Sequence, residues 1–257
     1  AFTSCEDGID GMDGVDGIDG VDGQDGADGQ DGADGSNGED GEDFEPGETM
    51  FSDKSATPPL VAMSSQFNYV EAFSLVSTPD VIGGDFQLAG SADGAGFLQD
   101  GEDYIFVTNC EDSYAVARIR FDQNLMPISG DYLLDSGVAD FARQCSATMW
   151  EADIHGGTED IFLSASESIH YDVKAIDPRT STPTPQADFG LDALGEFSWE
   201  NATPLPQNAY PGATVIVGGD DDSSNSEGQV SMYYSTAGDA DFTGGSIYVL
   251  RLKQVGD

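Results

Sequence analysis

A glycine occupies every third position from Gly8 to Gly41, which gives twelve consecutive Gly-X-Y triplets. In eleven of the twelve the third residue is an acid, as in Gly-Ile-Asp and Gly-Val-Asp. A strict Gly-X-Y period is typical of an extended helix with three residues per turn, because only a residue without Cβ fits where another chain approaches closely. Residues 8–43 are therefore predicted to form a collagen-like Gly-X-Asp repeat stalk.

The composition of this stalk leaves its assembly open. It contains no proline to pre-set the extended backbone and no Lys or Arg to pair with its acids. The sixteen acids within residues 1–45 repel one another, and divalent cations such as Ca²⁺ would relieve this repulsion. The stalk is thus either a tether, flexible or stiffened by cations, or the triple helix of a homotrimer.

The residues before the repeat resemble the end of a bacterial lipoprotein signal. In Phe2-Thr3-Ser4-Cys5, small residues precede a cysteine, as at the point where such a signal is cleaved and the cysteine is lipidated. Glu6 and Asp7 resemble the surface-export signal of some outer-membrane lipoproteins. Residues 1–7 are therefore expected to be a signal remnant that anchors the chain to the bacterial outer membrane, at the cell surface, through lipid at Cys5. The alternative is an ordinary cysteine.

The net charge of −41 restricts the classes of partner. It divides into −16 for residues 1–45 and −25 for the remainder. Nucleic acid is excluded as a partner, because its binding requires clustered Lys and Arg. With Cys5 assigned to lipid, Cys110 and Cys145 either pair as a disulfide or act separately.

Residues 44–65 are predicted to be a linker, because they combine Glu45-Pro46-Gly47 and Thr57-Pro58-Pro59 with few aromatic residues. Residues 66–257 contain short apolar runs of strand type between turn residues, and no stretch sustains a helical period over three turns. The domain is predicted to be all-β, with Trp150 and Tyr248 in its core. The predicted strands are 104–108, 114–121, 161–165, 213–217, 230–234 and 246–252.

The order of motifs over residues 81–252 resembles the PhoX-type alkaline phosphatase family. The segments that carry the resemblance are Phe86–Gly96, Ile105–Glu111, Ala115–Phe121, Gln144–Thr148, Phe162–Glu167, Gly195–Ala202, Gly219–Asp222 and Gly245–Arg251. This family forms a calcium-dependent β-propeller, so the resemblance implies a β-propeller-like domain with four-stranded blades.

The resemblance also implies metal ligands. Family members bind calcium and iron and hydrolyse phosphate esters, and clustered metal ions suit that chemistry because they stabilise phosphoryl charge. The positions that match the family's metal-site acids are Glu111, Glu167, Glu200, Asp220, Asp221 and Asp222, and Cys145 matches its iron-binding cysteine. The implied cofactors are Ca²⁺ and, through Cys145, iron.

Three ligand-type positions differ from the family pattern. The family's Asn-His-Glu is Asn109-Cys110-Glu111 here, its Cys-Glu-Glu is Ala165-Ser166-Glu167, and its His-Glu is Trp199-Glu200. In addition, a six-bladed propeller of this kind uses more residues than the segment 66–257 contains. The chain is therefore predicted to be either a fragment of a longer protein or a propeller with fewer blades.

Three functions follow from these observations. The favoured one is a non-catalytic Ca²⁺-binding module for binding or adhesion, displayed at the cell surface. The second is a metal-dependent phosphomonoesterase. The third is a structural protein whose stalks assemble into trimers or fibres.

Overall fold

The structure is a computed structural model, and it describes residues 51–137, 142–167, 171–181, 190–221 and 228–251. All of them belong to one compact unit that spans Glu45–Asp257. The predicted stalk, Cys5 and Asp222 lie outside the described residues.

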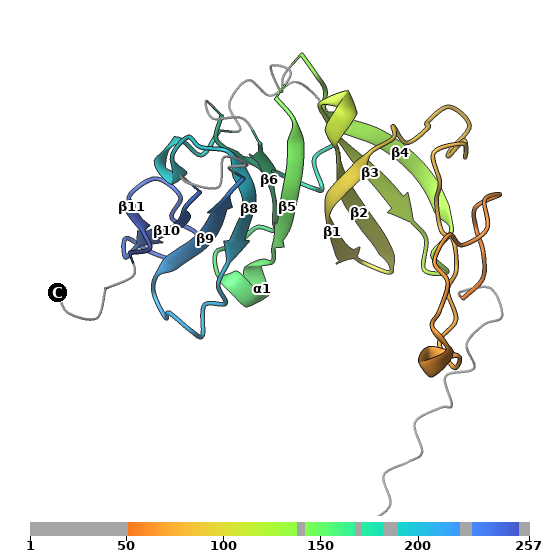
Figure 1. Cartoon of the computed structure of the whole chain (residues 1–257), viewed down its shortest axis with the longest axis horizontal. Helices are drawn as coiled ribbons and strands as arrows, with labels where there is room; N and C mark the ends of the chain where they lie inside the picture. The colour runs from red at the N-terminus through yellow and green to blue at the C-terminus, as the bar shows by residue number, and fades with distance from the viewer. Residues whose placement is uncertain (1–50, 138–141, 168–170, 182–189, 222–227, 252–257) are drawn as a thin grey trace, which may run out of the picture. The chain divides into compact units, whose positions relative to one another are not determined.

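Eleven strands in this part of the chain form three antiparallel sheets (Figure 1). The first sheet consists of β1 (Ala92–Asp100), β2 (Asp103–Cys110), β3 (Ala115–Phe121) and β4 (Pro127–Leu134). The second consists of β5 (Gln144–Trp150), β6 (Ile161–Ser166) and β7 (Val173–Ile176). The third consists of β8 (Trp199–Pro204), β9 (Thr214–Asp220), β10 (Val230–Ser235) and β11 (Ser246–Val249). The prediction of an all-β domain is confirmed.

Each sheet is a meander, because its strands are hydrogen-bonded in chain order. Short turns join the strands of the first sheet. Between β1 and β2, Asp100 pairs with Asp103, and Gly101 adopts a φ of +71° at the first position of the two-residue turn, where a residue without Cβ is favoured. Between β3 and β4, the carboxylate of Asp122 accepts hydrogen bonds from the backbone N–H groups of Asn124 and Met126, both at 2.8 Å.

Helices are few and short in the described residues. They are α1 (Ala152–His155) and the 3₁₀ helices η1 (Ser65–Phe67), η2 (Glu111–Ser113) and η3 (Asp192–Leu194). No helix of this part of the chain has the length and apolar character that crossing a membrane requires.

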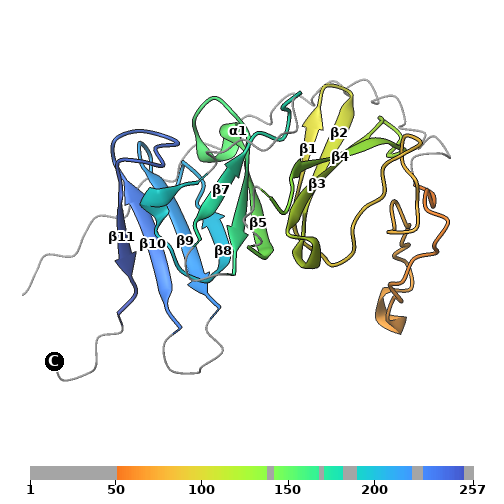
Figure 2. The same ribbon diagram turned by 90° about the horizontal axis from the view of Figure 1, so that it is seen from above.

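The first strands of the three sheets stand side by side, with β1 against β5 and β5 against β8 (Figures 1 and 2). Gly94 in β1 allows the closest approach. A Cβ added there would lie 2.1 Å from the backbone nitrogen of Ala147 in β5, so a side chain at this position would collide with the neighbouring sheet. The absence of a side chain at Gly94 therefore fixes how closely the first two sheets pack.

Three apolar clusters stabilise this arrangement. One lies between the first and second sheets and contains Ile105, Leu134 and Phe162. The next joins the second and third sheets around Trp150 and Trp199. The last covers the other face of the first sheet, where residues 82–89 pack on β3.

Most predicted strands are confirmed, with small changes at their ends. The last one is shorter than predicted, because β11 ends at Val249. Trp150 is fully buried, as predicted. The prediction that Tyr248 lies in the core is wrong. Tyr248 is 52% exposed, because β11 is the outermost strand of the third sheet.

Candidate metal centre at the sheet ends

Two strand positions recur in all three sheets and carry a potential metal ligand each time. The second residue of the first strand is Asp93 in β1, Cys145 in β5 and Glu200 in β8. The residue directly after the second strand is Glu111 after β2, Glu167 after β6 and Asp221 after β9. Because the paired strands are antiparallel, both positions lie at the same end of each sheet.

The same backbone hydrogen bond holds these positions together in each sheet. The N–H of Glu111 donates to the carbonyl of Ser91 at 3.0 Å, that of Glu167 to Arg143 at 3.1 Å, and that of Asp221 to Ser198 at 2.8 Å. Each acceptor is the residue directly before the first strand of its sheet. The three sheets thus present their ligand-type side chains through the same local geometry.

A break in strand register accompanies each of these positions. The register shifts between Ala92 and Ala95 in β1, between Gln144 and Ala147 in β5, and between Trp199 and Asn201 in β8. Such irregularities re-aim side chains and are common next to functional sites. Asp93, Cys145 and Glu200 each lie within the interval where the pairing shifts.

The six side chains form two groups, and each group draws on two neighbouring sheets. The first group is Asp93 and Glu111 of the first sheet with Cys145 of the second. The second is Glu167 of the second sheet with Glu200 and Asp221 of the third. Within each group, one ligand atom of every residue lies within 4.8 Å of the others. The two groups therefore mark the two junctions between sheets.

A buried polar network fixes the backbone at Cys145. The amide nitrogen of Asn109 donates to the carbonyls of Cys145 and Ser146 at 3.1 and 3.0 Å. The hydroxyl of Ser164 lies 2.9 Å from the side-chain oxygen of Asn109 and 2.8 Å from that of Gln144. Since Asn109, Gln144 and Ser164 are fully buried, these bonds are shielded from water and hold the first junction in one geometry.

Arg143 places a positive charge beside both groups. Its guanidinium forms an ion pair with Glu111, and it lies 3.6 Å from the carboxylate of Glu167 and 3.8 Å from that of Asp112. The Arg143 side chain is 50% exposed, so it is free to move towards solvent. The positive charge of Arg143 thus offsets the negative charge of acids from two sheets.

Two side chains of these groups, Cys145 and Glu200, have raised pKa values. Burial raises the pKa of the Cys145 thiol well above its ordinary value, and a hydrogen bond to Glu167 and the charges of Glu167, Glu111 and Asp93 raise it further. Burial also raises the pKa of Glu200, and nearby Asp221, Glu167 and Asp93 add to the effect. Both shifts mean that negative charge at the junctions is costly without a cation.

The donor atoms of the two groups differ in chemical type. Glu167, Glu200 and Asp221 offer only carboxylate oxygens, which are the ligands that Ca²⁺ prefers. The first group adds the sulfur of Cys145, a softer ligand that suits a transition metal such as iron once it is deprotonated. The hydroxyl of Ser166, which directly precedes Glu167, is buried and has no hydrogen-bond partner among the described residues. The residues present therefore fit a calcium ion at the second junction better than at the first.

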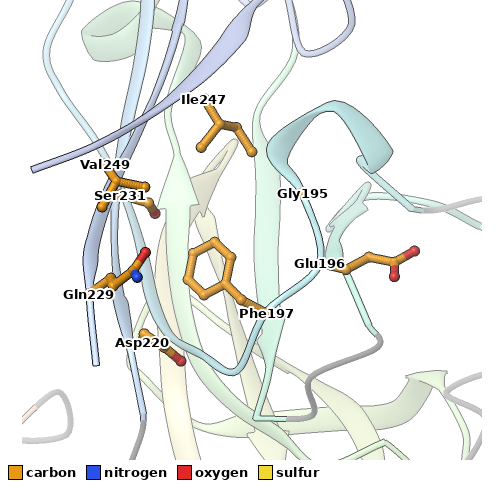
Figure 3. Close-up of a pocket in the computed structure, with 8 residues that line it drawn as sticks. All are labelled: Gly195, Glu196, Phe197, Asp220, Gln229, Ser231, Ile247 and Val249. Carbon is orange, nitrogen blue, oxygen red and sulfur yellow. The ribbon is translucent and has the colours of Figure 1, made fainter. Parts of the chain in front are cut away.

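The structure brings together most of the residues singled out in the sequence. Glu111 and Cys145 meet in the first group, and Glu167, Glu200 and Asp221 form the second. Asp220 belongs to neither group and lines a separate pocket (Figure 3). Cys110 and Cys145 are both free thiols, so they do not form the disulfide that the sequence leaves open.

Two residues of the site, Asp93 and Arg143, are not singled out by the sequence analysis. Asp93 lies in the short run Ala-Asp-Gly-Ala-Gly, which looks like a turn. The signal that identifies it is positional: Asp93 occupies the same place in its sheet as Cys145 and Glu200. Arg143 is recognisable only from the acids that surround it.

Comparison with known proteins identifies the N-terminal repeat. Residues 3–50 match the family model of the collagen triple helix repeat, which represents 20 copies of the repeat. No curated protein and no solved structure matches the chain significantly. The chain therefore carries a collagen-like repeat ahead of an all-β domain, and this repeat is compatible with a trimeric stalk.

Proposed function

We propose that this protein displays a Ca²⁺-binding β-domain on a collagen-like stalk and serves in binding or adhesion at a bacterial cell surface. The observation that carries the proposal is the pair of ligand groups at the two sheet junctions, built from equivalent positions of three sheets. The acids recur at one end of successive sheets, so each junction carries an excess of negative charge. Such a surface attracts cations.

The second group is the proposed calcium site. Its three carboxylates supply part of the six to eight oxygen ligands that Ca²⁺ takes, and Glu200 and Asp221 are exposed, so water or a ligand can complete the coordination. Burial raises the pKa of Glu200 and repulsion from the neighbouring acids adds to this, and a bound cation would offset that repulsion. The first group, with Cys145, is proposed to hold a second cation, iron included.

The sheet arrangement supports a β-propeller-like domain. Each sheet is a meander, the first strands of successive sheets stand together, and the ligand-type residues gather at one end of them. The resemblance to the PhoX-type family implies a β-propeller-like domain as well. The proposal is accordingly a propeller with a partial or reduced set of blades, anchored to the outer membrane by lipid at Cys5.

Calcium titration of the full chain by calorimetry tests this proposal. We expect Glu200→Gln to weaken calcium binding by about tenfold or more, equivalent to ~1.4 kcal/mol, because it removes one charged ligand without changing size. The matched control is Glu102→Gln in the exposed turn between β1 and β2. It removes the same charge from the protein as Glu200→Gln and leaves the stalk unchanged. Equal effects of the two variants would show that calcium binds diffusely to the acidic surface and would overturn the proposal.

One observation favours phosphoester hydrolysis as a second candidate function. Arg143 extends a half-exposed guanidinium between the two prospective cation sites, where it is able to bind a phosphate oxygen. Elemental analysis of the purified chain, together with p-nitrophenyl phosphate hydrolysis with and without a chelator, separates the two functions. Bound calcium and iron with chelator-sensitive turnover would support the phosphatase, and bound calcium without turnover would support the binding module.

A further inference from the structure

A small pocket lies on the third sheet, apart from the two ligand groups (Figure 3). Its volume is about 280 Å³. One wall is the chain segment before β8, and the other is formed by the end of β9, the start of β10 and β11. The lining residues are Gly195, Glu196, Phe197, Asp220, Gln229, Ser231, Ile247 and Val249.

The aromatic wall of this pocket is held in place. The ring of Phe197 stacks on Trp199 with centroids 3.9 Å apart and planes at 27°. Trp199 is buried, and its indole N–H donates to the carbonyl of Gly195 at 3.1 Å. Gly195 itself approaches Ile247 so closely that an added Cβ would lie 2.5 Å from the Ile247 side chain. The Phe197 ring is therefore held in one position at the wall of the pocket before any ligand binds.

The opposite wall carries polar atoms. Figure 3 shows the ring of Phe197 projecting towards Ser231 of β10 and Gln229, which directly precedes β10, with Asp220 below them. The backbone N–H of Asp220 donates to the carbonyl of Gln229 at 3.0 Å, which fixes the spacing of this wall. A carboxylate, an amide and a hydroxyl thus lie across from an aromatic ring.

The charge of the pocket selects against anions. Its charged lining residues are Asp220 and Glu196, of which the Glu196 side chain points away from the other lining residues (Figure 3), and none of the eight is Lys, Arg or His. Asp221, the next residue, belongs to the acidic group at the second junction and adds to the negative potential. Phosphates and other anions are therefore unsuitable ligands, and a positively charged ligand is favoured.

We propose that this pocket binds a compact organic cation of the alkylammonium class, either a quaternary ammonium or a protonated amine. The ring of Phe197 provides a cation–π surface, and the carboxylate of Asp220 provides the countercharge. The volume of about 280 Å³ lies just below the usual range for pockets that bind drug-sized ligands, which suits a ligand as small as choline. The site is separate from the proposed calcium site and does not depend on it.

Calorimetric titration of the full chain with choline chloride tests the proposal, at constant ionic strength and with saturating Ca²⁺. The uncharged isostere 3,3-dimethylbutan-1-ol has the same shape and serves as the control ligand. We expect choline to bind and the alcohol to bind at least tenfold more weakly, because only choline gains the attraction of Phe197 and Asp220. Equal binding of both, or no binding of either, would overturn the proposal.

Variants locate the binding. We expect Phe197→Leu to weaken choline binding by about threefold to thirtyfold, in line with the range of cation–π energies. The matched control is Phe97→Leu, which removes an exposed ring from the first sheet. Because Phe197 also packs on Trp199, Gln229→Ala at an exposed position provides a second variant that leaves this stack intact.

Two further results would contradict the assignment. Choline binding that survives both pocket variants would place the cation elsewhere on the acidic surface. Binding of methyl glucoside in preference to choline would identify a site for neutral sugars. Calcium affinity, measured in the same preparations, reports separately on the junction site, so failure of one proposal is distinguishable from failure of the other.

Discussion

The guanidinium of Arg143 lies where a divalent cation would be expected to act. It contacts Glu111 from the first sheet and Glu167 from the second, and so offsets charge in both ligand groups. An ion pair that is half exposed contributes little to stability, because water screens the two charges. A divalent cation is therefore able to displace the Arg143 guanidinium from these acids.

This competition predicts the effect of removing Arg143. We expect Arg143→Gln to strengthen calcium binding about tenfold, because the divalent ion no longer competes with a guanidinium that lies within 4 Å of the acids. The same variant is expected to lower the melting temperature in the presence of a chelator, because the acids then repel one another. Calcium titration and thermal unfolding measure the two effects.

The control for this variant is Arg251→Gln, which removes an equal charge from an exposed position after β11. Equal gains in affinity for the two variants would mean that only net charge matters. A loss of affinity in Arg143→Gln would show instead that Arg143 positions the ligands.

Among the strands, β1 shows how a local sequence of small residues serves a packing contact. Its Gly94 brings the backbone of β1 against that of β5 at Cys145 and Ala147. The register shift beside it directs Asp93 to the end of the sheet. The close packing of these two strands and the first ligand group are thus produced by the same few residues.

Substitution of Gly94 tests this link. We expect Gly94→Ala to destabilise the domain by about 2 kcal/mol or more, because the new Cβ would lie 2.1 Å from a backbone atom that cannot move independently. Urea unfolding measures the change. Gly90→Ala is the control, because a Cβ at Gly90 meets nothing within 4 Å. Similar stabilities of the two variants would show that the sheets separate easily at this junction.

The strands differ in how well the sequence predicts them. Alternating β-branched and aromatic residues identify β2, β3, β6, β9 and β10, since these strands have buried faces. The strand β1 is not predicted, because Ala-Asp-Gly-Ala-Gly lacks such residues and its conformation depends on contact with β5. Tyr248 is misplaced because its apolar character gives no information on whether another element covers β11.

The candidate site is less predictable than the strands. Glu111, Glu167 and Glu200 are named from the sequence, but their assignment to two junctions depends on the register of each sheet. Cys145 and Asp221 are named from the sequence as well, whereas Asp93 completes the first group through a strand position that no local pattern reveals. Asp220 and Asp221 are neighbours in sequence, yet Asp220, the last residue of β9, lines the pocket, and Asp221, directly after β9, belongs to the junction group.

At the scale of the whole molecule, the collagen-like repeat is proposed to set the number of chains. If it forms a triple helix, the full chain is a trimer in which three β-domains share one stalk. Three linked domains bind a repetitive surface far more strongly than one, provided that they engage it together. This would suit a protein that serves in adhesion.

Deletion of residues 8–43 tests the role of the repeat. We expect the full chain to be trimeric and the deletion variant to be monomeric, because the deletion removes all twelve Gly-X-Y triplets. Light scattering after size-exclusion chromatography, with and without Ca²⁺, measures the mass, and circular dichroism verifies that the sheets persist. A trimeric deletion variant would assign assembly to the β-domain, and a monomeric full chain would leave the repeat as a tether.

The placement of each ligand group across a junction has a mechanical consequence. The sheets follow one another along the chain, so a pulling force transmitted through the domain meets the two junctions in series. Ions held at both junctions would act as reversible cross-links, and the force needed to separate the sheets would then rise with the concentration of free calcium. The domain would be toughest in calcium-rich surroundings and would yield where the ion is scarce.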